Sequence, residues 1–382
     1  MAVAAVSLLT AVPASASSRA PSPVVQTQAF AEPADADDPA IWVHPHDPSR
    51  SVVLGTLKEG GLAAFGLDAR TLQRVPAGPG GRFNNVDVVG DLAVVSDRGQ
   101  DRIRVYRIDP RGAAAGAHVL RDVTDPAAAR VFPESAVDEQ RTAYGLAAGR
   151  DPVTGIRWVT VTRRHETRVA LLRLVDEPGG KVGTAPLATV DLPSSFRLPN
   201  GVSWSPCEEP GEGPQLEGSV LDGRVLYTAQ EDVGIWRIPL SPAGFGRPEL
   251  VDRVRSYGVP SRWDAVAEEC VPDGADAGFG GKWLEADAEG LAVAHGKLFA
   301  SSQGDSRFVV YGPGRTRDLR IVAGRGTDSV EHSDGSAIST AYLGREFPHG
   351  LLVVHDGERR PAAGDLATTG FAFLRLEDVI PR

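Results

Sequence analysis

The sequence contains little sulfur and no excess of positive charge. Its 382 residues include two cysteines and one methionine, and 40 Lys and Arg stand against 50 Asp and Glu, for a net charge of −10. Nucleic acids and anionic membranes bind basic surfaces, so this balance argues against either as the main partner. After the N-terminus, no segment reaches the roughly 20 consecutive apolar residues of a membrane-spanning helix.

Common catalytic motifs are also missing. The sequence has no G-x-S-x-G elbow, no H-E-x-x-H pair, no Walker loop and no R-H-G-x-R-x-P motif. Its histidines are dispersed along the chain. A covalent intermediate on the protein is therefore disfavoured, and any hydrolysis is expected to use a metal-activated water.

The first residues form an apolar stretch that ends in a small-residue pattern. Residues 1–16 read MAVAAVSLLTAVPASA, and the final Ala-Ser-Ala fits a cleavage site. We expect a secretory signal peptide over 1–16, a flexible segment over 17–30 and one domain over 31–382. An Ala-rich terminus of a cytosolic protein is the alternative. In a secreted protein Cys207 and Cys270 are expected to form a disulfide, and two free thiols are the alternative.

The sequence is rich in turns and in short apolar strands. It has 43 Gly and 29 Pro, and six times an apolar strand leads through a short polar turn into another. Such units, with about 60 residues per blade, are typical of β-propellers. We therefore predict an all-β, six-bladed propeller of four-stranded antiparallel blades around a central channel. Pairing of DDPAIWVHP with FAFLRLEDVI is expected to close the ring.

Each of the six turns carries a residue that can bind phosphate or a metal. A second polar signature precedes each unit, and antiparallel pairing brings both sets to one face. The first three turns are basic, with Tyr144 beside them, and the rest of this face is acidic. The turn residues are Lys58, Arg98, Arg164, Glu231, Gln303 and Asp356. The other acidic residues are Glu217, Asp287, Glu289, Asp328 and Asp334, with Asp37 and Asp38 across the ring closure.

This division of charge predicts two binding functions on one face. Apposed carboxylates repel one another unless a cation lies between them, and oxygen ligands of this kind select calcium. A basic wall opposite calcium is a site for a multiply charged anion such as a phosphate ester. Taken singly, each residue also has a simpler interpretation, as an exposed turn cation, an Asx turn or a solvated acidic loop.

Seven motifs resemble the β-propeller phytases, in the same order from about Asp35 to the C-terminus. They are DDPAIW, NNVDV, Tyr144-Gly145, QEDVGIW, DAEGL, ASSQG and FPHGLLVVHDGE. The resemblance implies a six-bladed, calcium-dependent enzyme that removes phosphate from inositol hexakisphosphate (phytate) by direct attack of a metal-bound water. The implied substrate is phytate or another polyphosphorylated small molecule, as its calcium complex. A secreted monomer is expected.

The resemblance also implies roles for individual residues. Lys58, Arg98, Tyr144 and Arg164 match the phosphate-binding group, and Glu217 and Asp287 are expected to share in catalysis. Two departures are Glu59, where the family often has a second lysine, and Gln230, which replaces an acid. The implied calcium ligands and supporting residues are Asp37, Asp38, Asn85, Asp87, Glu217, Glu231, Asp287, Glu289, Gln303, Asp328, Asp334 and Asp356.

Two other functions are compatible with a calcium-binding propeller. One is a non-enzymatic module that binds a partner on the same face, and the other is a calcium-dependent lactonase or esterase. Neither function requires three cations opposite the acidic cluster. Lys58, Arg98 and Arg164 therefore favour phosphate ester hydrolysis.

Overall fold

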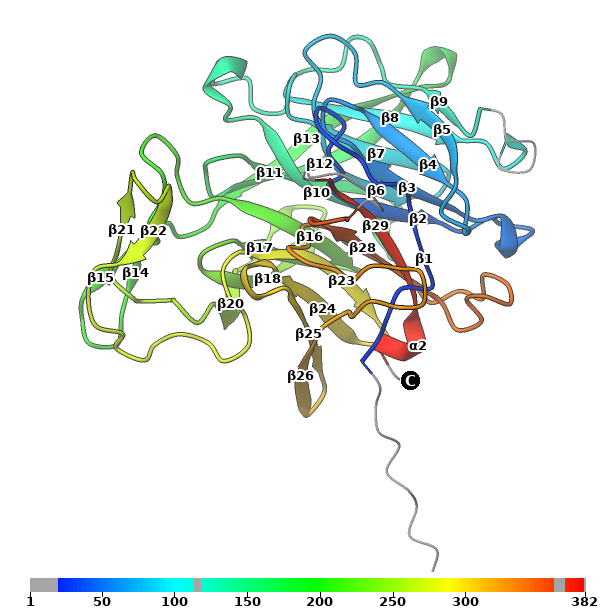
Figure 1. The fold of residues 1–382 in the computed structure, drawn as a ribbon. Helices are drawn as coiled ribbons and strands as arrows, with labels where there is room; N and C mark the ends of the chain where they lie inside the picture. The colour runs from blue at the N-terminus through cyan, green and yellow to red at the C-terminus, as the bar shows by residue number, and fades with distance from the viewer. Residues whose placement is uncertain (1–19, 113–117, 361–367, 381–382) are drawn as a thin grey trace, which may run out of the picture.

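The protein is a six-bladed β-propeller in the computed structural model, which describes residues 20–112, 118–360 and 368–380 (Figure 1). The predicted fold is thereby confirmed. The predicted signal peptide, residues 1–16, lies outside the described residues. Within the described ranges, no helix is long and apolar enough to cross a membrane.

The first three blades follow one another along the chain, each beginning with its innermost strand. Blade 1 consists of β2 (Pro39–Trp42), β3 (Val52–Thr56), β4 (Leu62–Phe65) and β5 (Thr71–Val75). Blade 2 consists of β6 (Phe83–Val89), β7 (Leu92–Asp97), β8 (Arg102–Ile108) and β9 (Leu120–Asp122). Blade 3 consists of β10 (Ala143–Arg150), β11 (Arg157–Arg163), β12 (Arg168–Glu177) and β13 (Lys181–Asp191).

The other three blades complete the ring. Blade 4 consists of β16 (Leu216–Asp222), β17 (Val225–Gln230), β18 (Gly234–Ser241) and β20 (Glu249–Arg253), and the short β19 (Gly244–Phe245) also pairs with β18. Blade 5 consists of β23 (Ala288–Ala294), β24 (Lys297–Ser302), β25 (Arg307–Gly312) and β26 (Arg315–Leu319). Blade 6 consists of β27 (Ser336–Ser339), β28 (Leu351–Asp356), β29 (Gly370–Arg375) and β1 (Val25–Gln26).

Short helical turns connect some of these strands. One α-helical turn, α2 (Leu376–Val379), follows blade 6 and buries two of its side chains. The 3-10 turns are η1 (Pro48–Arg50), η2 (Val137–Glu139), η3 (Pro178–Gly180) and η4 (Gln303–Asp305).

The segment that closes the ring is not the one expected. Val25 and Gln26 of β1 pair with β29, so the N-terminal segment supplies the outermost strand of blade 6 (Figure 1). Phe30 is buried and also pairs with Thr369. The predicted partner, DDPAIWVHP, instead forms β2 at the inner edge of blade 1. The propeller thus begins before residue 31, the boundary expected from the sequence.

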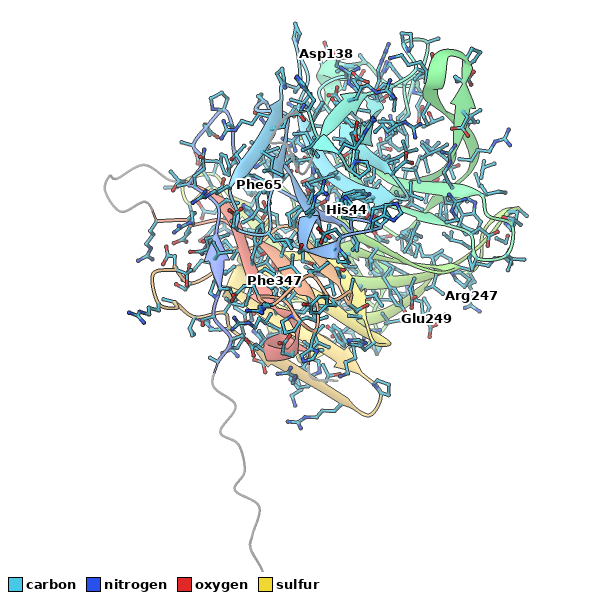
Figure 2. The ribbon with its side chains drawn as sticks, turned by 90° about the vertical axis from the view of Figure 1, so that its right-hand side faces the viewer. His44, Phe65, Asp138, Arg247, Glu249 and Phe347 are labelled. Atoms are coloured by element: carbon cyan, nitrogen blue, oxygen red, sulfur yellow. A yellow bond between two sulfur atoms is a disulfide. The ribbon has the colours of Figure 1, made fainter. Side chains whose placement is uncertain are left out.

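The hydrophobic core lies between the blades. β3 and β4, the two middle strands of blade 1, are buried along their whole length, because neighbouring blades cover both faces of the sheet there. The outer strand β5, with the sequence TLQRV, is partly exposed. At the ring closure, Phe65 and Phe347 belong to one buried cluster with Phe371 (Figure 2). Packing of this kind fixes the position of each blade relative to the next.

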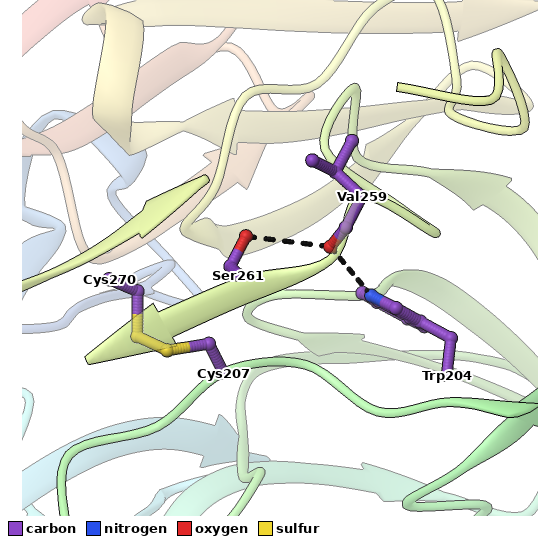
Figure 3. The surroundings of a disulfide bond; sticks show 5 residues. All are labelled: Trp204, Cys207, Val259, Ser261 and Cys270. Carbon is purple, nitrogen blue, oxygen red and sulfur yellow. Dashed lines mark hydrogen bonds between the residues drawn. A yellow bond between two sulfur atoms is a disulfide. The ribbon is translucent and has the colours of Figure 1, made fainter. Parts of the chain in front are cut away.

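Two small hairpins flank blade 4 and are joined by a disulfide. β14 (Phe196–Arg197) pairs with β15 (Ser203–Trp204) before the blade, and β21 (Ser261–Asp264) pairs with β22 (Glu269–Pro272) after it. The predicted bond between Cys207 and Cys270 is present (Figure 3). The indole Nε1 of Trp204 donates a hydrogen bond to the Val259 carbonyl at 2.9 Å. The two hairpins are therefore linked at two points.

A repeated irregularity in the inner strands presents the functional residues. The register between first and second strands shifts at an equivalent place in blades 2, 3, 4 and 5. Such β-bulges leave residues unpaired and turn their side chains in a new direction. The bulges contain Asn84-Asn85, Tyr144-Gly145, Glu217-Gly218 and Glu289-Gly290.

The glycines of these bulges allow adjacent blades to approach closely. A Cβ atom on Gly145 would lie 2.0 Å from the backbone oxygen of Glu217, whereas one on Gly149 of the same strand would meet only the Leu221 side chain, at 3.3 Å. We expect Gly145→Ala to lower the free energy of unfolding by about 1–3 kcal/mol, because the Glu217 backbone must move. Gly149→Ala should change it by less than about 1 kcal/mol. Urea denaturation of both variants checks this, and equal losses would contradict it.

Candidate active site

The polar turns and the inner-strand bulges meet on one face of the propeller. As predicted, the turn residues follow the second strand of each blade, or end it in the case of Asp356. Antiparallel pairing returns the third strand from the same end, so these turns adjoin the bulge residues. The residues concerned are Lys58, Arg98, Arg164, Glu231, Gln303 and Asp356.

A cavity of about 360 Å³ opens on the basic side of this face. Its lining includes Arg82, Arg98 and Arg164, together with Glu59. Arg82, which was not predicted, forms an ion pair with Glu59. It supplies a positive charge beside the position where Glu59 replaces the second lysine of the family. Burial, and then the charge of Arg98, lowers the pKa of Arg164. Three guanidinium groups around one space make it a site for an anion.

Arg98 connects the basic side to the acidic side. Its guanidinium carbon lies 5.6 Å from the centre of the Tyr144 ring, and Nη1 donates a hydrogen bond to Asn84 Oδ1 at 3.0 Å. Asn84 Nδ2 donates in turn to Glu217 and to Asn85 Oδ1. Tyr144 interacts electrostatically with Glu217. The predicted Asn85 thus supports Asn84. Asn84 itself was not predicted as a site residue, although it stands next to Asn85 in the NNVDV motif.

Lys58 is a fixed cation at the blade 1 side of the site. Its ammonium group forms an ion pair with Asp35, a residue that the sequence analysis did not select. Burial opposes the charge, but the carboxylates of Asp37 and Asp35 outweigh it and raise the pKa of Lys58. Lys58 therefore keeps its charge and stands next to the first acidic residues of the cluster.

Three glutamates from two blades form the centre of the acidic side. Glu217, Glu231 and Glu289 are buried, and one carboxylate oxygen of each lies within 4.8 Å of the others. In the described part of the chain, neither Glu231 Oε1 nor Glu289 Oε2 receives a hydrogen bond. Burial raises the pKa of Glu217 to about 7, and burial and mutual repulsion raise those of Glu231 and Glu289 well above their ordinary values. Buried carboxylates without donors are suited to hold a cation.

Three aspartates extend this cluster of glutamates. Asp37 is buried, with Oδ2 receiving no hydrogen bond from the described residues, and its charge acts on Glu217. The charges of Asp334 and Asp287 both act on Glu289. Gln303 donates a hydrogen bond from Nε2 to Asp334, which brings this predicted amide ligand to the same cluster.

Two other predicted ligands face the central channel. Asp38 Oδ2 accepts a hydrogen bond from the Val86 backbone at 3.0 Å, and Asp87 Oδ2 accepts one from the Ala148 backbone at 2.8 Å. Both aspartates line a cavity of about 260 Å³ between the inner strands. Their carboxylates thereby join the inner strands of adjacent blades.

Asp328 and Asp356 form a separate group with a residue of the N-terminal strand. Gln26 Nε2 donates hydrogen bonds to Asp356 Oδ2 at 3.5 Å and to the Asp328 carbonyl at 3.3 Å. The Asp328 backbone donates to Gln26 Oε1 at 2.7 Å. Asp305, two residues after Gln303, accepts a hydrogen bond from Arg255 at 2.9 Å.

Two acidic residues beside the cluster were not predicted. Burial, followed by the charge of Asp287, raises the pKa of Asp232 well above its usual value and that of Glu208 to about 7. Asp232 belongs to the QEDVGIW motif and was detectable there, whereas nothing in the sequence marked Glu208. Gln230 of the same motif accepts a hydrogen bond from the Trp236 indole at 2.9 Å, so it packs against the blade.

Titration of these buried groups makes stability depend on pH when calcium is absent. Burial raises the pKa of Glu217 and Asp356 to about 7 and that of Asp87 to about 6. Each such carboxyl binds its proton more tightly when folded, so its contribution to stability is lost as pH rises through the folded pKa. Burial lowers the pKa of His165 to about 4 and of His355 to about 3, and each contributes stability that is lost as pH falls below about 6.5.

The carboxyls outnumber the histidines, so the calcium-free protein should lose stability between about pH 5 and pH 7. Each carboxyl whose titration is not offset by a histidine lowers the free energy of unfolding by up to about 1.4 kcal/mol per pH unit, between its unfolded and its folded pKa. A cation that binds the ionised carboxylates should reverse this slope, and calcium is the ion to test. Thermal melts in EDTA and in calcium across this range measure both slopes. A melting temperature that rises with pH in EDTA would contradict the expectation.

Comparison with known proteins identifies the family of this chain. A family model described as Phytase matches residues 1–181 and 261–380. The chain belongs to the phytase family. The family expected from the seven motifs is thereby confirmed, and with it the class of enzyme. The unmatched residues, 182–260, include the strands of blade 4 and the hairpin of β14 and β15.

Individual relatives give the degree of similarity. The chain is 29% identical to the 3-phytase of Bacillus subtilis (strain 168) over 345 residues, which cover 85% of this chain and 75% of that protein. Among solved structures it is similar to regucalcin from Agrobacterium tumefaciens, with 14% identity and a TM-score of 0.45, over 90% of this chain and 91% of that chain. It is also similar to Sqt1 from Saccharomyces cerevisiae, with 12% identity and a TM-score of 0.47, over 94% of this chain and 100% of that chain.

Proposed function

We propose that this protein is a calcium-dependent phytase that hydrolyses phosphate monoesters by attack of water, without a covalent intermediate. Membership of the phytase family supports the substrate class. The observation that carries the finer proposal is the hydrogen-bonded path from Arg98 through Asn84 to Glu217. It joins the arginine-lined cavity to the buried carboxylates. A substrate phosphate and a cation would thus be bound side by side.

The carboxylate cluster suits calcium by the chemistry of its donors. Glu217, Glu231 and Glu289 offer only oxygen atoms, two of which are buried and receive no hydrogen bond from the described residues. Hard oxygen ligands of this kind favour calcium over transition metals. Asp37, Asp287, Asp334 and Gln303 would complete the shell. When bound, calcium supplies positive charge that offsets the carboxylates and lowers the pKa of water that it contacts.

The basic side chains would hold the substrate. Arg98 and Arg164 can each bind two oxygens of a phosphate group, and Lys58 adds a compact charge. Arg98 is oriented before substrate arrives, because Tyr144 lies under its guanidinium and Asn84 accepts its hydrogen bond. Such preorganised donors stabilise charge that builds on the phosphoryl oxygens in the transition state. A second phosphate in the cavity beside Arg82 would favour substrates with adjacent phosphates.

Glu217 is the residue that we assign as general base for the attacking water. Its carboxylate accepts a hydrogen bond from Asn84 and lies where the basic and acidic sides meet. The water oxygen would attack phosphorus, the ester P–O bond would break, and the inositol oxygen would leave and take up a proton. Glu217 would accept the proton that the water loses.

Phosphate release from sodium phytate tests this function. We expect release with calcium, loss of release with excess EDTA and recovery when calcium is restored. Full release in EDTA would contradict calcium dependence, and no release under any condition would contradict the substrate. Hydrolysis of a lactone or a carboxylic ester in place of phytate would favour the lactonase or esterase alternative.

The remaining proposals concern the protein as a whole. We propose that it is secreted, because a disulfide such as Cys207–Cys270 persists in oxidising compartments. We also propose that it acts as a monomer on the calcium complex of phytate. Size-exclusion chromatography with light scattering tests the oligomeric state, and detection of the protein in the culture medium tests secretion.

A further inference from the structure

A loop that precedes blade 4 reaches across to the acidic cluster. Residues 205–215 connect β15 to β16. Near the end of the loop, Gln215 Oε1 accepts a hydrogen bond from the His165 backbone at 3.0 Å, and Nε2 donates one to Glu231 Oε2 at 3.0 Å. Glu212 lies 3.5 Å from His165 Nε2 and 3.9 Å from Arg164. The loop is thus fastened to the basic turn of blade 3 and to a glutamate of the cluster.

Glu208 brings a further carboxylate from this loop to the cluster. Its Oε1 atom is buried and receives no hydrogen bond from the described residues. Its charge and that of Asp287 both act on Asp232, and Asp287 in turn acts on Glu231. Glu208 and Asp287 therefore both lie near Asp232, which follows Glu231 directly in the sequence.

These four carboxylates have no ion-pair partner among the described residues. Glu231 exposes only 9% of its surface, and one of its oxygens receives no hydrogen bond from that part of the chain. Burying several ionised carboxylates without compensation is unfavourable, so a bound cation is the consistent neutraliser.

We propose that Glu208 is a calcium ligand supplied by this loop, and that the Cys207–Cys270 bond holds it in place. The proposal rests on the calcium dependence proposed above. Cys207 directly precedes Glu208, and its partner Cys270 lies on β22, beyond blade 4 (Figure 3). The bond therefore anchors the loop at the ligand, and Gln215 anchors its other end. Glu208 also falls in the segment 182–260 that the family model does not match.

Calcium binding measured by isothermal titration calorimetry on the full secreted chain tests the proposal. After removal of calcium with EDTA, Glu208→Gln should bind calcium at least about tenfold more weakly at one site, or bind one ion fewer. The matched control is Glu209→Gln, an exposed neighbour on the same loop, which should bind as the wild type does. Near-UV circular dichroism without calcium verifies that each variant is folded.

A double-mutant comparison tests the part played by the disulfide. The variant Cys207→Ser/Cys270→Ser should weaken calcium binding in the same way, and adding Glu208→Gln to it should cause little further loss. Wild-type calcium affinity and stoichiometry in Glu208→Gln would overturn the proposal. Glu231→Gln separates the two hypotheses. If it weakens binding while Glu208→Gln does not, only the role of Glu208 is wrong, and if neither does, the calcium site itself is wrong.

Discussion

Replacing Arg98 by alanine is expected to lower the rate of phosphate release from phytate by about 100- to 1000-fold. Arg98 is the residue that touches both halves of the site, through the Tyr144 ring and Asn84. Its loss removes a preorganised donor for the phosphoryl oxygens and leaves Asn84 free to change its hydrogen bond to Glu217. Steady-state kinetics with calcium phytate measure the effect, and most of it should be in kcat/KM.

The matched control for this variant is Arg121→Ala. Arg121 is exposed on β9, the outer strand of blade 2, and carries the same charge. It should retain activity within about twofold of the wild type. Arg98→Lys should recover only part of the loss, because an ammonium group cannot bind two phosphate oxygens as guanidinium does. Full activity of Arg98→Ala would show that the arginine-lined cavity is not the substrate site.

Glu289→Gln is expected to have opposite effects on the protein with and without calcium. In EDTA the variant should be more stable than the wild type, because one of three mutually repelling buried carboxylates becomes neutral. In calcium it should lose most of the stabilisation that the ion provides, because a ligand is lost. Activity should fall by about 100-fold or more, since a bound ion is required for catalysis in the proposed mechanism.

Thermal melts in EDTA and in millimolar calcium measure these two effects. The quantity of interest is the difference between the two melting temperatures, which should shrink strongly in Glu289→Gln. Glu249→Gln is the matched control, because Glu249 is an exposed glutamate on the outer strand β20 (Figure 2). An unchanged difference in Glu289→Gln would contradict the assignment of the cluster to calcium.

The fold was largely predictable because each unit carries its own signal. An apolar strand, a short polar turn and a second apolar strand form from residues near one another in sequence. The ring closure was not predictable in the same way. β1 has only two residues, Val25 and Gln26, and a strand of that length has no recognisable periodicity. Its pairing with β29 depends on the completed ring, which brings the two ends of the chain together.

The residues of the site also differ in how far local sequence patterns could predict them. Arg98, Tyr144, Glu217 and Glu289 lie in turns or bulges with distinctive neighbours, so the motifs indicated them. Arg82 and Asn84 lie within three residues of the predicted Asn85 and were missed, because their roles depend on partners in other turns or blades. Glu208 depends on a disulfide that spans 63 residues, and no local pattern marks it.

The number of blades, the polar residue in each turn and the division of the face into basic and acidic halves could all be predicted from short-range patterns of apolar and charged residues. Only the folded chain shows which carboxylates share a cluster, which line the channel and which loop reaches the site. These groups come from different blades, so their distances depend on packing between blades and on the glycines that let inner strands approach, such as Gly145 against Glu217.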